Sequence, residues 1–179
     1  MLLIVLVGNS GSGKTSLREH LQDHGFLGFE AGTYADKICD NSKKSNLDFF
    51  MKHKNRALVA KAIYRDIKAK KAENIVISGL RIPEEIIFLR KRFKNMHVIG
   101  LYAPENVCYR RTLNRKNRVH FPDLKTFILE RMYEDYAHGL GYVFYRMIDF
   151  TIDNEKNDIE IGKKQLDDFL KKVRKGMKE

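Results

Sequence analysis

The chain has 179 residues, the size of one domain with room for a small insertion. Hydrophobic residues make up 43% of it and charged residues 32%, which excludes a disordered or fibrous protein. The longest apolar run, residues 1–7, is too short to cross a membrane and lacks the flanks of a signal peptide. Because two cysteines, Cys39 and Cys108, cannot form a disulfide framework, we expect a reduced, soluble, cytoplasmic protein without a membrane partner.

Positive charge is unevenly distributed along the chain. The sequence has 34 Lys and Arg against 23 Asp and Glu, a formal net charge of +11. Residues 43–71 contain ten basic and two acidic side chains, and residues 81–118 contain ten basic and three acidic ones. A localised positive field of this kind indicates a polyanionic partner, either the phosphates of a small molecule or a nucleic-acid backbone.

The first elements are a strand, a loop and a helix in direct succession. Residues 2–7 are uninterruptedly apolar and predict a strand buried on both faces. A Gly/Ser loop over residues 8–13 follows, and then a helix over residues 14–24, which Gly25 is suited to end. This succession is typical of the opening of a βαβ unit.

The rest of the chain continues to alternate strands with helices. We expect strands over residues 26–29, 74–78, 97–102 and 149–153. We expect helices within residues 46–72 (one or two), over 83–93 and 105–115, from about 123, and after an Asn157 cap with Glu160 at the capping-box position. The pattern predicts an α/β fold, a three-layer, doubly wound parallel sheet with helices on both faces. Ligands bind such sheets at the carboxyl ends of the strands, here after Val7, Phe29, Ser78 and Tyr102.

A phosphate-binding motif lies between the first strand and the first helix. Residues 8–15, Gly-Asn-Ser-Gly-Ser-Gly-Lys-Thr, match the pattern G-x-x-x-x-G-K-[ST] in full. Glycines let the backbone N–H groups turn toward an anion, and the helix adds the positive end of its dipole. Lys14 is placed to reach the β- and γ-phosphates, and the Thr15 hydroxyl is a ligand for Mg²⁺. We therefore predict that ATP is bound by Gly8, Asn9, Ser10, Gly11, Ser12, Gly13, Lys14 and Thr15, with Thr15 as the metal ligand.

Arginines after the fourth strand are candidates for stabilising a transferred phosphoryl group. Charge spreads over the oxygens of that group during transfer, so cations are the main requirement. Arg111 and Arg115 lie four residues apart on one helical face, in a segment expected to form a lid, and Arg118 follows. The alternative for this cluster is a solvated basic helix face. Beside a phosphate loop we favour the catalytic role for Arg111 and Arg115.

The ends of the second and third strands supply the remaining candidates. Glu30 and Asp36 are carboxylates that could orient or deprotonate a hydroxyl acceptor, or serve a structural role such as helix capping. Arg81 could hold an anionic group of the acceptor, or pair at the surface with Glu84 or Glu85. We predict Glu30 as a catalytic residue, and Arg81 and Asp36 as acceptor-binding residues.

The aspartate expected at the end of the third strand is missing. Many phosphate-loop enzymes end the third strand with an Asp that holds Mg²⁺ through water, but this strand ends with Ser78. The metal would then rely on Thr15, nucleotide oxygens and water. The absence argues against a motor-type ATPase or a GTPase.

These motifs resemble the nucleoside-monophosphate-kinase-like group of phosphate-loop kinases, and more narrowly dephospho-CoA kinase and its dephospho-CoA-kinase-like relatives. The resemblance rests on the motifs GNSGSGKT (8–15), SGLRIPEE (78–85), YAPENVCYRRTLNR (102–115), FILER (127–131) and IDFTIDN (148–154). The resemblance implies a five-stranded parallel sheet, ATP as donor, a core of residues 1–42, 73–105 and 147–179, a helical acceptor segment of about 43–72 and an arginine-bearing lid of about 106–125. It also implies that Glu30 occupies the position of the base.

The sequence therefore predicts an ATP- and Mg²⁺-dependent kinase that acts on an anionic, nucleotide-like small molecule. Dephospho-CoA and a (deoxy)nucleoside monophosphate both fit as acceptors. Two other functions fit parts of the sequence. Ser78, and Gly32 in place of a second Asp, suit an ATP-binding regulator that has lost catalysis. The two basic segments suit an ATP-binding protein associated with nucleic acid, although the chain has none of the recognised nucleic-acid-binding modules. The sequence makes no prediction of the oligomeric state.

Overall fold

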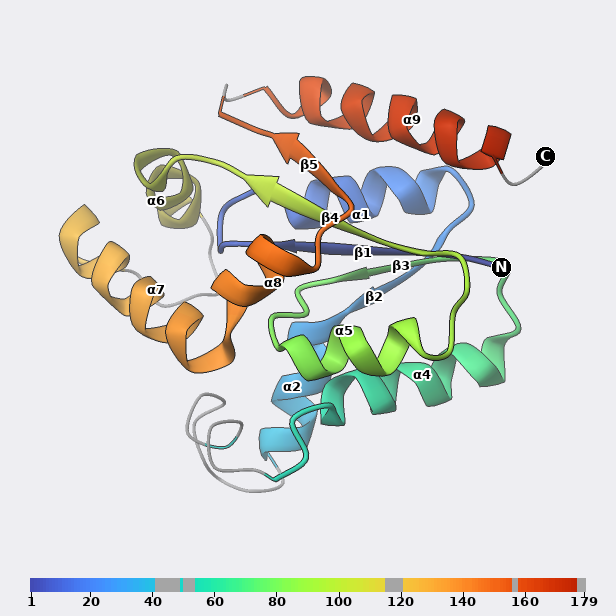
Figure 1. The fold of residues 1–179 in the computed structure, drawn as a ribbon. Helices are drawn as coiled ribbons and strands as arrows, with labels where there is room; N and C mark the ends of the chain where they lie inside the picture. The colour runs from blue at the N-terminus through green and yellow to red at the C-terminus, as the bar shows by residue number, and fades with distance from the viewer. Residues whose placement is uncertain (41–48, 50–53, 115–120, 156–157, 177–179) are drawn as a thin grey trace.

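The computed structural model describes residues 1–40, 49, 54–114, 121–155 and 158–176 (Figure 1). Five strands form one parallel sheet in the order β2-β3-β1-β4-β5. Their bounds are Leu2–Gly8 (β1), Leu27–Glu30 (β2), Asn74–Ser78 (β3), Met96–Tyr102 (β4) and Phe150–Asp153 (β5). The predicted fold, a doubly wound parallel sheet between two layers of helices, is thereby confirmed.

Eight helices have both ends within the described residues, and most match the expected ones. Their bounds are Lys14–Asp23 (α1), Ala31–Asp40 (α2), Leu58–Lys70 (α4), Pro83–Arg90 (α5), Glu105–Leu113 (α6), Leu124–His138 (α7), Leu140–Arg146 (α8) and Ile159–Gly176 (α9), with residue 49 helical as well. Two predicted helices end early, α5 at Arg90 and α6 at Leu113. The expected cap Asn157 lies outside the described residues, and the Asp158 carboxylate accepts the Glu160 N–H at 3.0 Å.

Helices α2 and α8 were not predicted. Ala31 follows β2 directly, with no turn residue or capping side chain to mark the start of α2. The helical signal in α2 is the spacing of Ala31, Ala35, Ile38 and Cys39, all of which pack in the core. Helix α8 begins immediately after Gly139, whose φ of 83° ends α7. Gly139 is a helix-ending residue in the left-handed conformation, so the chain turns there rather than continuing as one helix.

Two hydrophobic clusters fill the spaces above and below the sheet. Because successive strand residues point to opposite faces, Leu3, Val5 and Val7 contact the cluster formed with α4, α5 and α8. Leu2, Ile4 and Leu6 contact the cluster formed with α1 and α9. Strand β1 is therefore buried on both faces, as its uninterrupted apolar sequence predicts.

Helices α6 and α7 lie beyond the carboxyl ends of the strands, on the left in Figure 1. They share a third, smaller cluster of Ala103, Cys108 and Phe127. In the part of the chain that the structure describes, no helix has both the length and the apolar character needed to span a bilayer.

Glu85 in the first turn of α5 is a fully buried acid. Its Oε2 accepts hydrogen bonds from the N–H groups of Arg81 at 3.4 Å and Ile82 at 3.3 Å, so it closes the capping box of the helix. Burial raises the pKa of Glu85 from 4.5 to about 8, against the effect of those two N–H groups.

We expect Glu85 to make stability fall as pH rises. The folded pKa lies above the unfolded one, so the contribution of Glu85 is fully present below pH 4.5 and is lost as pH rises through about 8. Relative to Glu85→Gln, which keeps an accepting oxygen but does not titrate, the free energy of unfolding should fall with a slope of up to about 1.4 kcal/mol per pH unit across this window. Urea unfolding at several pH values measures the difference. Glu84→Gln, a change at the exposed neighbouring residue, serves as the control. If Glu85→Gln changes the pH slope of the unfolding free energy no more than Glu84→Gln does, the assignment is contradicted.

Candidate functional site

The phosphate loop connects β1 to α1 at the carboxyl edge of the sheet. Gly11 and Gly13 have φ values of 85° and 105°, a conformation that other residues rarely adopt. A Cβ at Gly11 would lie 2.5 Å from the carbonyl oxygen of Cys108, and one at Gly13 would lie 2.5 Å from Nδ2 of Asn154. The glycines therefore let the loop pack directly against α6 and the segment after β5.

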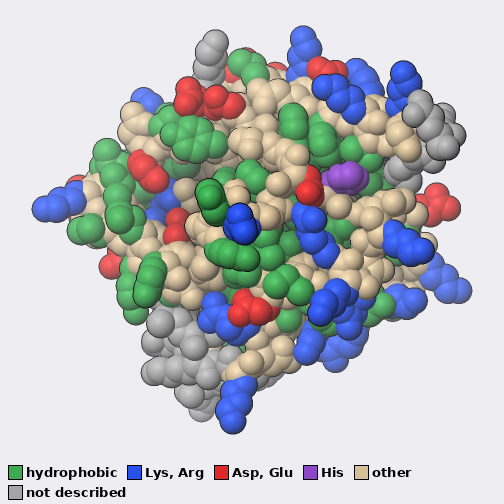
Figure 2. Space-filling model, viewed as in Figure 1, with side chains coloured by type: hydrophobic (Ala, Val, Ile, Leu, Met, Phe, Trp, Pro, Cys, Tyr) green, Lys and Arg blue, Asp and Glu red, His purple; other side chains and the backbone are tan. Residues whose placement is uncertain are grey.

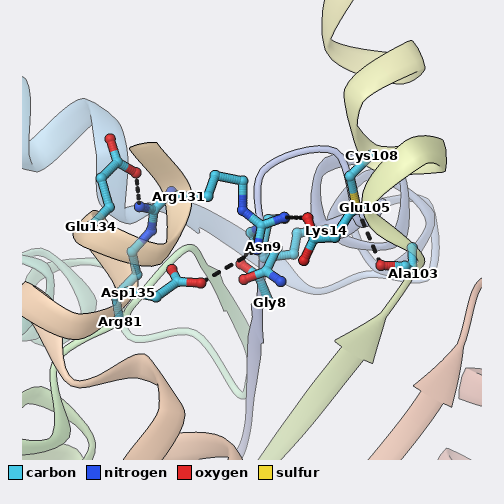
Figure 3. A network of polar contacts seen from close by, with 10 residues as sticks. All are labelled: Gly8, Asn9, Lys14, Arg81, Ala103, Glu105, Cys108, Arg131, Glu134 and Asp135. Atoms are coloured by element: carbon cyan, nitrogen blue, oxygen red, sulfur yellow. Dashed lines mark hydrogen bonds and ion pairs between the residues drawn. The ribbon is translucent and has the colours of Figure 1, made fainter. Parts of the chain in front are cut away.

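Lys14 lies beneath the loop that precedes it. Its Nζ donates hydrogen bonds to the carbonyl oxygens of Gly8 and Asn9, both at 2.7 Å (Figure 3). The ammonium group is thus held within the curve of the loop. Thr15 follows in the first turn of α1, which contains no acidic residue, so the positive end of the helix dipole is not neutralised by its own side chains.

Arg111 and Asn154 hold the outer side of the loop. The buried Asn154 donates from Nδ2 to the Ser12 carbonyl at 2.8 Å. Arg111 donates from Nη1 to the Gly11 carbonyl at 3.1 Å and from Nη2 to the Asn154 carbonyl at 3.3 Å. The structure thus places the expected lid arginine against the backbone of the loop. Asn154 was not among the predicted site residues, although it ends the IDFTIDN motif and lies one residue after the last strand.

The edge formed by β2 and β3 carries an ion pair that was not expected. Glu30 and Ser78 are register partners at the ends of the two strands. Arg18, one turn beyond Thr15 on α1, donates from Nη1 to Glu30 Oε2 at 2.8 Å and to Ser78 Oγ at 3.3 Å. Only 13% of the Arg18 side chain is exposed. The carboxylate predicted as the base is therefore bound to a guanidinium, and an Asp at position 78 would have faced that same group.

A second arginine pair connects α7 to the site (Figure 3). Arg81, after β3, donates to Glu134 Oε2 at 2.8 Å, whereas Glu84 and Glu85 were the expected surface partners. Arg131, which is 6% exposed, pairs with Glu105 at the start of α6 and with Asp135 at 3.3 Å. Two arginines from different elements are therefore held by α7 and α6 carboxylates beyond the carboxyl ends of the strands. Arg131, the last residue of the FILER motif, was not among the predicted site residues.

The other predicted residues do not join this group in the described chain. Asp36 is exposed on α2. Arg115 and Arg118 lie outside the described residues. Cys108 is fully buried beside Gly11 and donates from Sγ to the Ala103 carbonyl at 3.5 Å. Burial raises the pKa of its thiol, so Cys108 is protonated and serves in packing.

The polar groups of the site are better suited to bind a nucleotide than to hold a metal ion with protein ligands alone. Across the described ranges, no group of three His, Cys, Asp or Glu side chains could hold a metal ion. The Thr15 hydroxyl, in the first turn of α1, stays the protein oxygen that the sequence predicts for Mg²⁺, with a nucleotide expected to supply other ligands. The glycine cradle and the ammonium group of Lys14 fit a polyphosphate.

This combination of sheet order, glycine loop and Lys-Thr pair defines a P-loop NTPase domain with a kinase-like fold. The chain belongs to a family of AAA domains, AAA_18, whose model matches residues 4–121.

The chain is also similar to curated archaeal proteins. It is 27% identical over 179 aligned residues to a UPF0200 protein of Methanothermobacter thermautotrophicus, covering 97% of this chain and 91% of that protein. It is 27% identical over 165 residues to a UPF0200 protein of Methanopyrus kandleri, covering 87% and 82%.

Solved structures of small-molecule kinases share the fold. Shikimate kinase from Bacteroides thetaiotaomicron superposes with a TM-score of 0.64 at 16% identity, covering 95% of this chain and 98% of that one. A sugar kinase from a Janibacter species gives 0.66 at 15% identity, with coverage of 96% and 95%. A gluconokinase from Sinorhizobium meliloti gives 0.63 at 17% identity, with coverage of 97% and 95%.

We expect Gly11→Ala to destabilise the loop and weaken nucleotide binding. The new methyl group meets Cys108 backbone atoms at 2.5 and 2.8 Å, and the left-handed φ adds about 1–2 kcal/mol. Thermal unfolding and ATP titration calorimetry measure both effects. Gly141→Ala is the matched control: nothing lies within 4 Å of its Cβ position in α8, so stability should rise by about 0.5–1 kcal/mol. Equal behaviour of the two variants would contradict the packing argument.

Proposed function

We propose that the protein is an ATP-dependent phosphotransferase that transfers the γ-phosphoryl group of ATP to a nucleotide or nucleotide-like acceptor bearing an anionic group. The observation that carries the proposal is that two paired arginines, Arg81 and Arg131, and the glycine loop with Lys14 all lie at the carboxyl ends of the strands. A polyphosphate donor and an anionic acceptor need cations on two sides of the transferred group, and this arrangement supplies them.

On the donor side, the loop and Lys14 bind the phosphates. Bound ATP replaces the Gly8 and Asn9 carbonyls as the partner of the Lys14 ammonium, whose charge then lies on the β- and γ-oxygens. Arg111 and Asn154 keep the loop in shape by holding its carbonyls from outside. Mg²⁺ at the Thr15 hydroxyl would neutralise part of the phosphate charge.

On the acceptor side, α7 carboxylates mark where an anion fits. A phosphate offers a guanidinium the same paired oxygens as a carboxylate does. Glu134 on Arg81 therefore occupies the place that the anionic group of the acceptor takes, and this substitution is favourable because Glu134 is 42% exposed and can turn to solvent. Arg131 is more deeply buried, and Glu105 and Asp135 hold it in place. In this proposal Arg115 acts as a lid arginine, as the sequence predicts.

During transfer, an acceptor oxygen forms a bond to the γ-phosphorus while the bond from that phosphorus to the β–γ bridging oxygen breaks, releasing ADP. A hydroxyl acceptor, as in dephospho-CoA, must also lose a proton, and Glu30 is the carboxylate at the strand edge that can take it. A nucleoside monophosphate attacks through an oxygen that carries no proton and needs no base. The two acceptor classes thus make different demands on Glu30.

A regulator that binds ATP without turnover is the second candidate. The pairing of Arg18 with Glu30 and Ser78 favours it, because the edge that would hold a base and a metal-organising carboxylate has a guanidinium instead. Turnover with any acceptor eliminates this candidate.

We expect ADP release from ATP and Mg²⁺ to depend on an added acceptor. The assay compares dephospho-CoA with a panel of ribo- and deoxynucleoside monophosphates. Lys14→Ala should lower the rate by about 10²–10³-fold, since it removes a charge from the transferring group. If no acceptor supports ADP release while calorimetry still detects ATP binding, the regulator is correct; if ATP does not bind, both candidates fail.

We expect Glu30→Gln to separate the acceptor classes and Arg18→Gln to act through Glu30. With a hydroxyl acceptor, Glu30→Gln should lower kcat by about 10²–10⁴-fold; with a phosphate acceptor it should barely change kcat. If Arg18 positions Glu30, Arg18→Gln lowers kcat in the native background and adds nothing to Glu30→Gln. The four rates of this double-mutant cycle are the measurement, and additive losses would contradict the coupling.

A further inference from the structure

The outer surface of α4 and α5 carries a set of cations that the proposed function does not use. We define the α4–α5 basic face by six exposed side chains: Lys61, Arg65, Lys68, Lys91, Arg92 and Lys94. The three on α4 are spaced i, i+4, i+7, so they share one side of the helix over about 10 Å. The other three follow the last turn of α5. Figure 2 shows Lys and Arg side chains gathered over these two helices.

Aromatic rings join the two halves of the face. The Arg92 guanidinium lies 3.6 Å from the ring centre of Phe88 and 5.5 Å from that of Tyr64. The Lys61 ammonium lies 5.8 Å from the same Phe88 ring. Cations from both helices are therefore held over one ring between them, and the face is continuous across the α4–α5 contact.

The acids of these helices do not neutralise the face. Asp66 on α4 accepts a hydrogen bond from Tyr34, Glu84 pairs with Arg56 at 3.4 Å, and Glu85 is buried. Among the residues that the structure describes, none of the six cations forms an ion pair with a carboxylate. Six positive charges against the one exposed carboxylate of α4, Asp66, leave the face strongly positive and attract a polyanion.

We propose that the α4–α5 basic face binds the phosphate backbone of a nucleic acid, without reading its sequence. A protein partner would need apolar anchors, yet Ile87, which is 42% exposed, is the only large apolar side chain of α4 and α5, both described in full, that counts as exposed. A lipid bilayer would need an apolar face to insert, whereas the apolar side of α4 (Val59, Ala60, Ile63 and Ile67) is in the core. Regularly spaced phosphates need only cations, because binding is driven by counterion release.

The position of the face leaves the phosphate loop accessible. Helices α4 and α5 both run from the loop edge of the sheet toward its opposite edge, so Lys68 and residues 91–94 lie at the end away from the loop (Figure 1). Most of the face, from Arg65 onward, is thus away from the loop, so nucleic acid would not have to cover the ATP site. The inference does not rest on the proposed phosphotransfer, because its test contains no nucleoside triphosphate.

Fluorescence anisotropy with labelled RNA of mixed sequence, single-stranded and as a duplex, tests the proposal over a salt series. The slope of log Kd against log salt should fall by about two to three when three phosphate contacts are removed by Lys61→Gln, Arg65→Gln and Lys68→Gln together. Affinity at low salt should drop by roughly tenfold to a hundredfold. Circular dichroism and thermal unfolding verify that the triple variant is folded.

The matched control removes the same charges from α9, by Lys164→Gln, Lys171→Gln and Arg174→Gln. These exposed cations are interspersed with the acids Glu160, Asp167 and Asp168, so RNA binding should remain close to that of the native protein. Equal losses in the two triple variants would show a general charge effect and overturn the assignment, as would the absence of binding at low salt. Stronger binding to phosphatidylserine vesicles than to RNA, lost in the α4 triple variant, would assign the face to membranes instead.

Discussion

The close packing of the phosphate loop against α6 and the end of β5 is the constraint on which the rest of the site depends. Gly11 and Gly13 allow backbone contact where any side chain would collide with Cys108 or Asn154. Arg111 and Asn154 then bind the carbonyls of Gly11 and Ser12 from outside, and Lys14 binds those of Gly8 and Asn9 from inside. The contacts from outside can persist when an anion takes over the Lys14 ammonium, so the backbone of the loop needs little reorganisation, which is the condition for electrostatic preorganisation.

The fold was largely predictable because its signals are local. An unbroken apolar run predicts β1, and the Gly-x-x-x-x-Gly-Lys-Thr spacing places the loop directly after it. The two helices that were missed lack such signals: α2 starts without a cap immediately after β2, and α8 is separated from α7 only by Gly139. Their apolar residues show helical spacing, but over windows too short to distinguish a helix from an irregular segment.

The location of the site residues was predictable from the sequence, but most of their interaction partners were not. Strand ends identified Glu30, Ser78 and Arg81, because parallel strands bring their carboxyl ends to one edge. Their partners come from elements far away in the sequence: Arg18 from α1 and Glu134 from α7. Arg111 illustrates the same limit, since its helical position was anticipated but its contact with Gly11, one hundred residues earlier, follows only from the fold. Pairings of this kind depend on tertiary packing, which residue types and spacing do not encode.

The small cluster of Ala103, Cys108 and Phe127 makes α6 and α7 a unit with a core of its own. Such a unit can open without unfolding the sheet, because the two large clusters on either face share no residue with it. Cys108 is both part of that core and the backbone contact of Gly11. Opening of the α6–α7 unit would therefore remove one wall of the loop at the same moment, which couples the shape of the loop to the packing of two helices outside the large clusters of the sheet.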